Sequence, residues 1–297
     1  MFTGLSAFPL TPLRDDAVDE RAFVGLVERL AAAGVDSITA LGSTGSYAYL
    51  DEAERGRVAE LAVAHAGGTP VFVGVGALRT SQVLRNVERA EAAGASGLLL
   101  SAMSYQPLTQ DDVFELFRTV VEHTELPVIV YDNPGATHFA FTTELHGRIG
   151  QLPRIASIKI PGMHHDAEAA RAQVAAIRAV VPDHVTIGIS GDVFAATGLN
   201  AGCDAWYSVL GGTLPAATLA ITRAAQAGRT ADVEEESRRL APLWALFAEH
   251  GGSLRVVAAI AEHFGWAPRR CLPLPLQGLD GAQRARVIDV VEQLGLA

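Results

Sequence analysis

Residues 128–131 read Val-Ile-Val-Tyr, and the same unbroken apolar character recurs at Val71–Val73 and Leu98–Leu100. A strand with one face in water alternates apolar and polar residues, whereas a parallel strand covered by helices on both faces is continuously apolar. These short runs therefore predict buried parallel strands, and the longer amphipathic stretches between them predict the covering helices.

Outward from these runs, eight short apolar or β-branched segments are predicted as strands. Most of them begin about 25–35 residues apart, which is the length of one βα unit. The segments are Gly4–Phe8, Asp36–Leu41, Pro70–Gly74, Ser96–Ser101, Pro127–Tyr131, Ile155–Lys159, Val185–Ile189 and Ala205–Leu210. Eight such units fit an α/β fold of the (β/α)8 TIM-barrel class, which is the fold we predict.

Local signals at the helix ends agree with this alternation. Asp51 with Glu54, and Thr109 with Asp112, have the spacing of a capping box, and the first helical pattern ends at Gly34. An open, doubly wound sheet is the alternative architecture. It is disfavoured because no Gly-x-Gly-x-x-Gly motif follows the first strand.

Beyond about residue 228 the pattern becomes wholly helical, with candidate helices at Ala231–His250, Ser253–Phe264 and Gly281–Leu294. We therefore divide the chain into a (β/α)8 barrel at residues 1–228, which carries the active site, and a C-terminal helical extension at residues 229–297, which packs on the barrel.

The composition excludes several classes of protein. Lys and Arg number 23 and Asp and Glu number 33, so the net charge is −10, which disfavours a nucleic acid or an anionic membrane as partner. No apolar run approaches the roughly 18 residues of a membrane helix, and the N-terminus lacks the features of a signal peptide. The two cysteines, Cys203 and Cys271, have no metal-binding spacing, and we expect a cytoplasmic protein.

The basic residues contain the strongest chemical signal. Of the 23, 22 are Arg, and the single lysine is Lys159, at the end of the predicted strand Ile155–Lys159. The alternative, non-catalytic interpretation is a lysine whose side chain reaches solvent from the end of a strand. A chain that uses Arg everywhere else would place Arg there too, so we infer that this position requires an amine, which can lose its proton and attack a ketone.

Tyr131 ends the preceding strand, so adjacent strands would place it beside Lys159 at the C-terminal end of the barrel, where TIM barrels carry their catalytic groups. A tyrosine there suits proton transfer next to an amine nucleophile. The alternative is an aromatic strand end whose hydroxyl contacts water.

Small residues follow three other predicted strands. Gly42-Ser43-Thr44-Gly45-Ser46 is either a plain turn or a cradle whose N–H groups and hydroxyls hold a carboxylate. Ser190-Gly191-Asp192 and Gly211-Gly212 occupy positions where barrels often bind phosphate, but glycines that merely allow tight turns explain them slightly better. We interpret His164 and His165 as solvated, and Trp206, Tyr207 and Met103 as pocket wall or core.

In these motifs the sequence resembles the dihydrodipicolinate synthase / N-acetylneuraminate lyase family of Schiff-base-forming class I aldolases, along essentially the whole chain. The markers are Gly42-Ser43-Thr44-Gly45, Ser104-Tyr105, Tyr131-Asp132-Asn133-Pro134-Gly135, Ile158-Lys159 and Ser190-Gly191-Asp192. Each is modest alone, but five in this order and spacing are highly specific. The resemblance implies a TIM barrel with a C-terminal helical extension, assembled as a homotetramer, a dimer of dimers.

The resemblance also implies roles for individual residues. Lys159 would form the Schiff base with pyruvate or another 2-oxo acid, and Tyr131 would be the acid/base. Ser43 and Thr44, in the loop that includes Gly45, would hold the keto-acid carboxylate, with Ser43 also relaying protons. Tyr105 would complete the relay from the neighbouring subunit. We add Tyr207 and Ala136 as candidate substrate-binding positions.

The sequence departs from the synthase pattern around the second substrate. Ser46 stands where the synthases have Glu after the loop, Ile160-Pro161 stands where Glu-Ala follows the lysine, and Ala136 stands where an Arg binds the semialdehyde carboxylate. We therefore predict a lyase, either aldolase or dehydratase, that acts on a different 2-oxo acid and needs no metal and no organic cofactor. The alternatives are 4-hydroxy-tetrahydrodipicolinate synthase, a phosphosugar-type barrel enzyme and a non-catalytic keto-acid sensor.

Overall fold

The computed structural model describes residues 1–296, so Ala297, the last residue of the predicted extension, lies outside the described residues. Eight parallel strands close into a barrel in the order β1-β10-β9-β8-β7-β6-β5-β4. They are β1 (Gly4–Ala7), β4 (Ser37–Ala40), β5 (Val71–Gly74), β6 (Gly97–Ser101), β7 (Val128–Tyr131), β8 (Ile155–Ile160), β9 (Thr186–Ser190) and β10 (Ala205–Ser208). Each contains residues from one predicted segment, and the prediction of a TIM barrel is confirmed.

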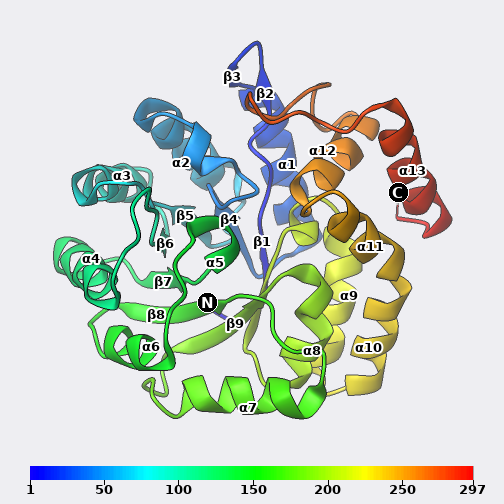
Figure 1. The fold of residues 1–297 in the computed structure, drawn as a ribbon. Coiled ribbons are helices and arrows are strands. Elements are labelled where there is room, and N and C mark those ends of the chain that lie inside the picture. Colours follow the sequence, from blue (N-terminus) through cyan, green and yellow to red (C-terminus); the bar gives the residue numbers. More distant parts are fainter. Residues whose placement is uncertain (297) are drawn as a thin grey trace.

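Helices surround the barrel and cover the outer faces of its strands (Figure 1). They are α1 (Glu20–Ala33), α2 (Glu52–His65), α3 (Thr80–Ala92), α4 (Gln110–His123), α6 (Thr143–Gly150), α7 (Ala167–Arg178), α8 (Ala195–Asn200) and α9 (Pro215–Gln226). Both predicted capping boxes are present, at Asp51 with Glu54 and at Thr109 with Asp112, and Gly34 ends α1 with φ 74°. A position with left-handed backbone conformation at the C-terminus of a helix favours glycine, and this explains why the first helix ends at Gly34.

Short helical turns follow several strands at the C-terminal end of the barrel. They are η1 (Tyr47–Tyr49) after β4, α5 (Pro134–Thr137) after β7, η2 (Asp192–Phe194) after β9 and η3 (Leu210–Gly212) after β10. A small antiparallel hairpin of β2 (Leu13–Arg14) and β3 (Ala17–Val18) was not among the predicted elements. Its two turn residues are Asp15 and Asp16, both with positive φ, and this pair lacks the glycine that usually marks such a turn.

The prediction of one helix over Ala231–His250 is wrong, because the chain forms α10 (Thr230–Arg239) and α11 (Ala241–Glu249) with a break at Leu240. Pro242 lies in the first turn of α11. Proline has no N–H to donate and its ring clashes with the preceding turn, so it is tolerated only where a helix begins. Two further helices follow, α12 (Leu254–His263) and α13 (Gly281–Gln293), near the predicted bounds. The division at residue 228 stays a prediction.

Inside the barrel is a small apolar cluster, separate from the larger core between the sheet and the helices. Its buried members are Phe8, Phe72, Leu99, Ile129, Tyr131, Ala205 and Tyr207, and Phe2 stacks on Phe72. These side chains fill the barrel, so a substrate can be bound only above them, at the loops that follow the strands. Within residues 1–296 no helix has the length and apolar character needed to span a bilayer.

Candidate active site

Lys159 lies on β8 with its side chain inside the barrel, and it is 5% exposed. The strand register pairs it with Tyr131 on β7, so the two are neighbours, as the sequence predicts. Its Nζ is 4.1 Å from the ring centroid of Tyr131 and 5.4 Å from that of Phe8. Burial lowers the pKa of Lys159 to about 7, against the opposing charges of Asp192 and Asp132. An amine with this pKa is partly unprotonated near neutral pH and can act as a nucleophile.

The hydroxyl of Tyr131 is the centre of a small polar network. The side-chain amide of Asn133 donates to Oη at 2.8 Å, and Ser43 Oγ lies 3.0 Å from the same oxygen. Burial raises the pKa of Tyr131 to about 12, so the side chain is a neutral phenol. Because Asn133 donates to it, Tyr131 can pass its own proton to Ser43 or to a bound molecule.

The loop after β4 brings Ser43 to this network. A Cβ on Gly42 would come within 2.4 Å of the Phe8 ring, and one on Gly45 would come within 3.0 Å of the Leu41 backbone, so the loop packs closely against both. Thr44 is buried, whereas Ser43 is open to the barrel mouth. The local reason for the small residues is therefore close packing, which places the Ser43 hydroxyl beside Tyr131.

Asp192 joins the loops that follow β9 and β10. Its carboxylate accepts hydrogen bonds from the Trp206 indole at 3.0 Å and from the backbone N–H groups of Leu210 at 2.8 Å and Val209 at 3.3 Å. Burial raises the pKa of Asp192. A buried carboxylate occupies the donors that a phosphate would need, so this loop pair does not have the character of a phosphate site.

The glycines after β10 serve packing. A Cβ on Gly212 would come within 1.9 Å of the Phe8 carbonyl oxygen, and the Gly211 N–H donates to Ser208 Oγ. This agrees with the interpretation of these glycines as residues that allow a tight turn.

Tyr207 lies in the barrel interior, below the mouth. Its hydroxyl is 2.7 Å from Ser157 Oγ, one layer beneath Lys159 on the same strand, and its ring packs edge-on against Phe8. Gly188 leaves the room for this ring, since a Cβ there would come within 2.3 Å of it. Tyr207 therefore forms the floor of the site, and its contact with a substrate stays a prediction. Trp206, predicted to be either pocket wall or core, is fully buried and belongs to the core.

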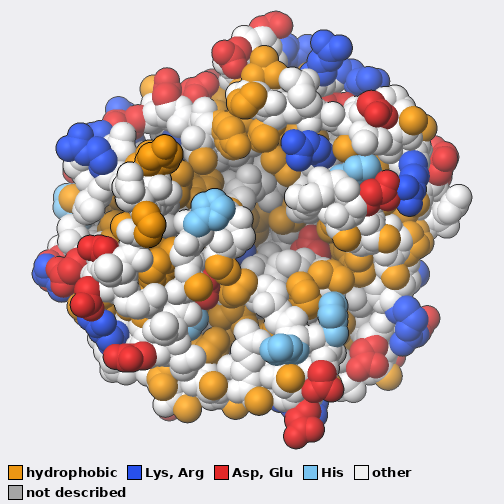
Figure 2. All heavy atoms as spheres, viewed as in Figure 1, with side chains coloured by type: hydrophobic (Ala, Val, Ile, Leu, Met, Phe, Trp, Pro, Cys, Tyr) orange, Lys and Arg blue, Asp and Glu red, His pale blue; other side chains and the backbone are white. Residues whose placement is uncertain are grey.

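The mouth of the barrel contains the remaining predicted residues. Figure 2 shows a hollow at the centre of this face, with several histidine side chains around it. Ala136 is exposed on α5, and Tyr105 is 90% exposed on the loop after β6. His164 and His165 are exposed, as predicted, and His165 stacks on Phe194.

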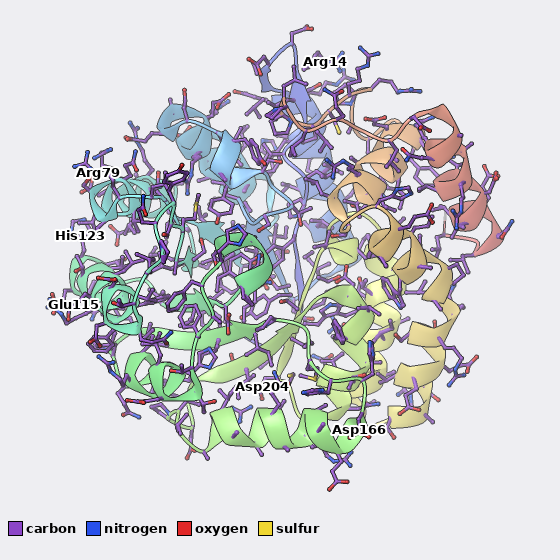
Figure 3. All side chains as sticks on the ribbon, viewed as in Figure 1. Arg14, Arg79, Glu115, His123, Asp166 and Asp204 are labelled. Carbon is purple, nitrogen blue, oxygen red and sulfur yellow. The ribbon has the colours of Figure 1, made fainter. Side chains whose placement is uncertain are left out.

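The two arginines nearest in sequence to Ala136 are engaged elsewhere. Arg148 pairs with Asp111 at 2.8 Å and lies over the ring of Phe114, and Arg154 pairs with Glu125. These partners lie on the outer helices and on the loops that connect them. Figure 3 labels Glu115, which lies on α4, the same helix as Asp111. Neither arginine is free to supply the cation that Ala136 lacks.

One feature of the site escaped the sequence analysis. The carboxylate of Asp132, which directly follows Tyr131, lies with its Oδ2 3.3 Å from Nε2 of His146 on α6, and both side chains are buried. His146 lies in an ordinary amphipathic helix pattern, so no local signal sets it apart. The only hint was Asp132 itself, which stands in the marker motif immediately after Tyr131.

Comparisons with known proteins agree with the geometry. A family model described as "Dihydrodipicolinate synthetase family" matches residues 1–294. A 4-hydroxy-tetrahydrodipicolinate synthase of Methylococcus capsulatus is 32% identical over 299 residues, covering all of both chains. The crystal structure of a dihydrodipicolinate synthase from Agrobacterium tumefaciens is 42% identical, with a TM-score of 0.94 over 99% of this chain and 98% of that one. One from Thermotoga maritima is 26% identical, with a TM-score of 0.91 over the whole of both chains.

Proposed function

Since the chain belongs to the dihydrodipicolinate synthetase family and is a lyase of that family, we propose that it forms a Schiff base between Lys159 and a 2-oxo acid such as pyruvate. One observation carries the proposal. The only lysine of the chain is buried at the end of β8, with its amine against Tyr131 and its pKa lowered to about 7 by burial. Desolvation of an amine in a barrel is a known route to a nucleophilic lysine.

The reaction begins when the neutral amine of Lys159 attacks the C2 carbonyl of the 2-oxo acid. The resulting carbinolamine loses water and becomes an iminium ion, which draws electrons from the neighbouring carbon. Either C3 then loses a proton, or the C3–C4 bond breaks and the C4 hydroxyl releases its proton as an aldehyde forms. In the cleavage, the enamine that remains takes a proton at C3 and becomes an iminium ion again. In the dehydration, the enamine expels the protonated C4 hydroxyl as water, and an unsaturated iminium ion forms. Addition of water to the iminium carbon then returns the ketone and the free amine.

Tyr131 and Ser43 are suited to the proton transfers. Their oxygens are 3.0 Å apart, and the phenol of Tyr131 is neutral because burial raises its pKa to about 12. We propose that Tyr131 passes protons between the reacting centre and Ser43 rather than existing as a free phenolate. The N–H groups and hydroxyls of Ser43, Thr44 and Gly45 would hold the carboxylate of the 2-oxo acid.

Ala136 stands where the synthases have a cationic arginine. Its presence supports a substrate that is uncharged at the end distant from its 2-oxo acid group. Aspartate semialdehyde has its own carboxylate, and a carboxylate is best bound by an arginine fork. With Ala136 there, and with Arg148 and Arg154 paired elsewhere, we propose aldol cleavage or dehydration of a 2-oxo acid with a hydroxylated tail. His138, exposed after α5, is a candidate partner for such hydroxyls. Synthase activity remains the second candidate, because the curated relatives have that name.

We therefore expect the condensation of pyruvate with aspartate semialdehyde to have a kcat/KM below about 10⁴ M⁻¹s⁻¹. A missing charge-assisted contact to a carboxylate costs roughly a ten- to hundredfold loss in binding. The check is a coupled assay beside cleavage and dehydration assays on 2-oxo-3-deoxy sugar acids. Ala136→Arg should raise the synthase activity. A wild-type synthase rate in the ordinary enzyme range would show that Ala136 does not determine specificity.

We further propose a homotetramer built as a dimer of dimers, in the cytoplasm, where the two free thiols of Cys203 and Cys271 would persist. Exposed Tyr49, Leu78 and Tyr105 support an interface, because they lie on the loops after three neighbouring strands, β4, β5 and β6. A second copy placed there would bring its Tyr105 toward this site.

Sedimentation at micromolar concentration should show a tetramer. Leu78→Glu, on the proposed interface, should produce smaller species, because a charge would be buried between subunits. Val180→Glu is the matched control, since Val180 is also an exposed apolar residue but follows α7. A monomeric wild-type protein would remove Tyr105 from the site and leave the proposal for Lys159 unaffected.

The central test is borohydride reduction in the presence of a panel of 2-oxo acids, followed by intact mass measurement. A substrate that forms the Schiff base should add one reduced adduct per chain, on the peptide that contains Lys159. A protein that binds a 2-oxo acid without any adduct would support the non-catalytic sensor instead.

A further inference from the structure

The buried pair of Asp132 and His146 connects the active-site edge of β7 to the surrounding helices. Asp132 follows the last residue of β7, and His146 lies in the middle of α6. Their facing atoms, Oδ2 and Nε2, are 3.3 Å apart, and each side chain is at least nine-tenths buried. A buried carboxylate is costly unless a partner offsets its charge, so the two residues must be considered as a unit.

The backbone of Asp132 contacts the proposed nucleophile directly. Its N–H donates to the carbonyl oxygen of Lys159 at 3.0 Å. Tyr131 precedes it and Asn133 follows it, and these two neighbours bond to each other through the phenol oxygen. Successive side chains of a strand point to opposite faces, so Tyr131 enters the barrel while Asp132 turns out toward α6. One residue therefore links the outer helix to the backbone of both Lys159 and Tyr131.

The orientation of His146 is set by its surroundings. Its ring stacks on Phe141 with centroids 5.4 Å apart and planes 10° apart, and Phe141 packs edge-on against Phe117 and Phe139. Within the described residues, both ring nitrogens of His146 and Oδ1 of Asp132 are buried without a hydrogen-bond partner, so the 3.3 Å approach of Nε2 to Oδ2 of Asp132 is a close polar contact and not a hydrogen bond. The one ion-pair contact found for the imidazole within the described residues is with Oδ2 of Asp132.

We propose that Asp132 and His146 are positioning residues, which hold the Tyr131–Asn133 segment against the backbone of Lys159 and keep one negative charge behind its amine. That charge opposes the desolvation of Lys159 and would stabilise the cationic iminium ion. The catalytic part of this inference rests on the proposed function, but the charge and the geometry do not.

Two carboxylates oppose the desolvation of Lys159, and the other charged groups around α6 do not. The stronger of the two is Asp192 from η2, which is held by Trp206 and the η3 backbone. The charged groups on α6 itself, and those on the α4 and α7 helices packed against it, are outer-surface residues, several of them in ion pairs. They are Glu144, Arg148, Asp111, Asp112, Glu115, Arg118, Glu122, His123, Glu168, Arg171 and Arg178. Apart from Asp192, the negative charge that acts on the Lys159 amine is therefore that of Asp132.

The single lysine allows a direct test without any substrate. Protein grown on lysine that carries ¹³C at Cε has one lysine resonance, so its pH titration reports the pKa of Lys159 alone. Asp132→Asn keeps the shape but removes the charge, and it should lower that pKa by roughly half a unit. His146→Phe keeps the stacked ring but leaves Asp132 buried without a partner. The carboxylate would then have no partner that holds it behind the amine, and the pKa of Lys159 should again fall.

Leu145→Ala is the control, because it removes buried packing from the same helix without changing any charge. It should leave the Lys159 pKa unchanged even if it lowers the melting temperature. An unchanged Lys159 pKa in folded Asp132→Asn overturns the proposal, and His146→Phe decides in the same way if the first variant fails to fold. At a pH where the amine is neutral in every variant, both pair variants should still trap a 2-oxo acid roughly tenfold more slowly, because the amine is misplaced.

The proposed function and this inference fail in different ways. A wild-type protein that traps no 2-oxo acid contradicts the Schiff-base lyase but leaves the titration intact. A wild-type protein that traps a 2-oxo acid, with an Asp132→Asn variant that has the same Lys159 pKa, keeps the lyase and removes the pair from its machinery.

Discussion

Lys159→Arg should abolish both the borohydride adduct and turnover. Burial lowers the pKa of Lys159 to about 7, so below that pH the side chain is mostly an ammonium ion and above it mostly a nucleophilic amine. Arginine keeps a similar length and charge but stays protonated, with a pKa above about 12. Intact mass after reduction and steady-state kinetics on the same sample measure the two effects together. In the wild type, the trapping rate should rise with pH through about 7 and then level off.

A matched control separates the position of the lysine from its mere presence. In the double variant Lys159→Arg, Arg171→Lys, the chain again has one lysine, but on an exposed position of α7. An exposed lysine keeps its ordinary high pKa, so this protein should neither form the adduct at neutral pH nor turn over substrate. If Lys159→Arg alone remains active, the Schiff-base mechanism is wrong.

Tyr131→Phe should retain adduct formation and lose turnover by roughly 10²–10⁴-fold, which is the usual contribution of a general acid/base group. The ring that lies 4.1 Å from the Lys159 amine is kept, so the nucleophile should still be oriented and desolvated. Only the oxygen that Ser43 and Asn133 contact is removed. Single-turnover trapping and steady-state rates, measured side by side, distinguish Schiff-base formation from the later proton transfers.

Tyr47→Phe is the matched control for that variant. Tyr47 is also a buried tyrosine whose hydroxyl contacts a serine, Ser101 at 2.9 Å, but it lies outside the proposed relay. Its loss should change stability more than turnover. A Tyr131→Phe enzyme within about threefold of the wild type would reduce Tyr131 to a wall of the site.

Much of the fold was predictable because its signals are local. Short apolar or β-branched runs, three of them with a continuously apolar stretch, marked the eight barrel strands, and Asp51 and Thr109 marked helix starts through contacts only three residues long. The failures were local conflicts as well. Pro242 broke a helix that periodicity alone extended, and the Asp15–Asp16 turn formed a hairpin without its usual glycine.

Sequence order alone predicts that Lys159 and Tyr131 are neighbours, because consecutive parallel strands in a barrel align their C-terminal ends, and the strand register confirms it. The sequence also determined that Lys159 is chemically special, since it is the one lysine beside 22 arginines. Both conclusions need only composition and strand order.

Which polar atoms contact one another depends on how the elements pack in three dimensions. Ser43 and Tyr131 are 88 residues apart in the chain, and their contact depends on how closely Gly42 and Gly45 let the β4 loop pack against its neighbours. The pairing of Asp132 with His146 depends on the angle at which α6 lies on the barrel and on the aromatic ring that orients the imidazole. Side-chain contacts between separate elements are set by packing at the scale of an ångström, and no local periodicity in the chain encodes that distance.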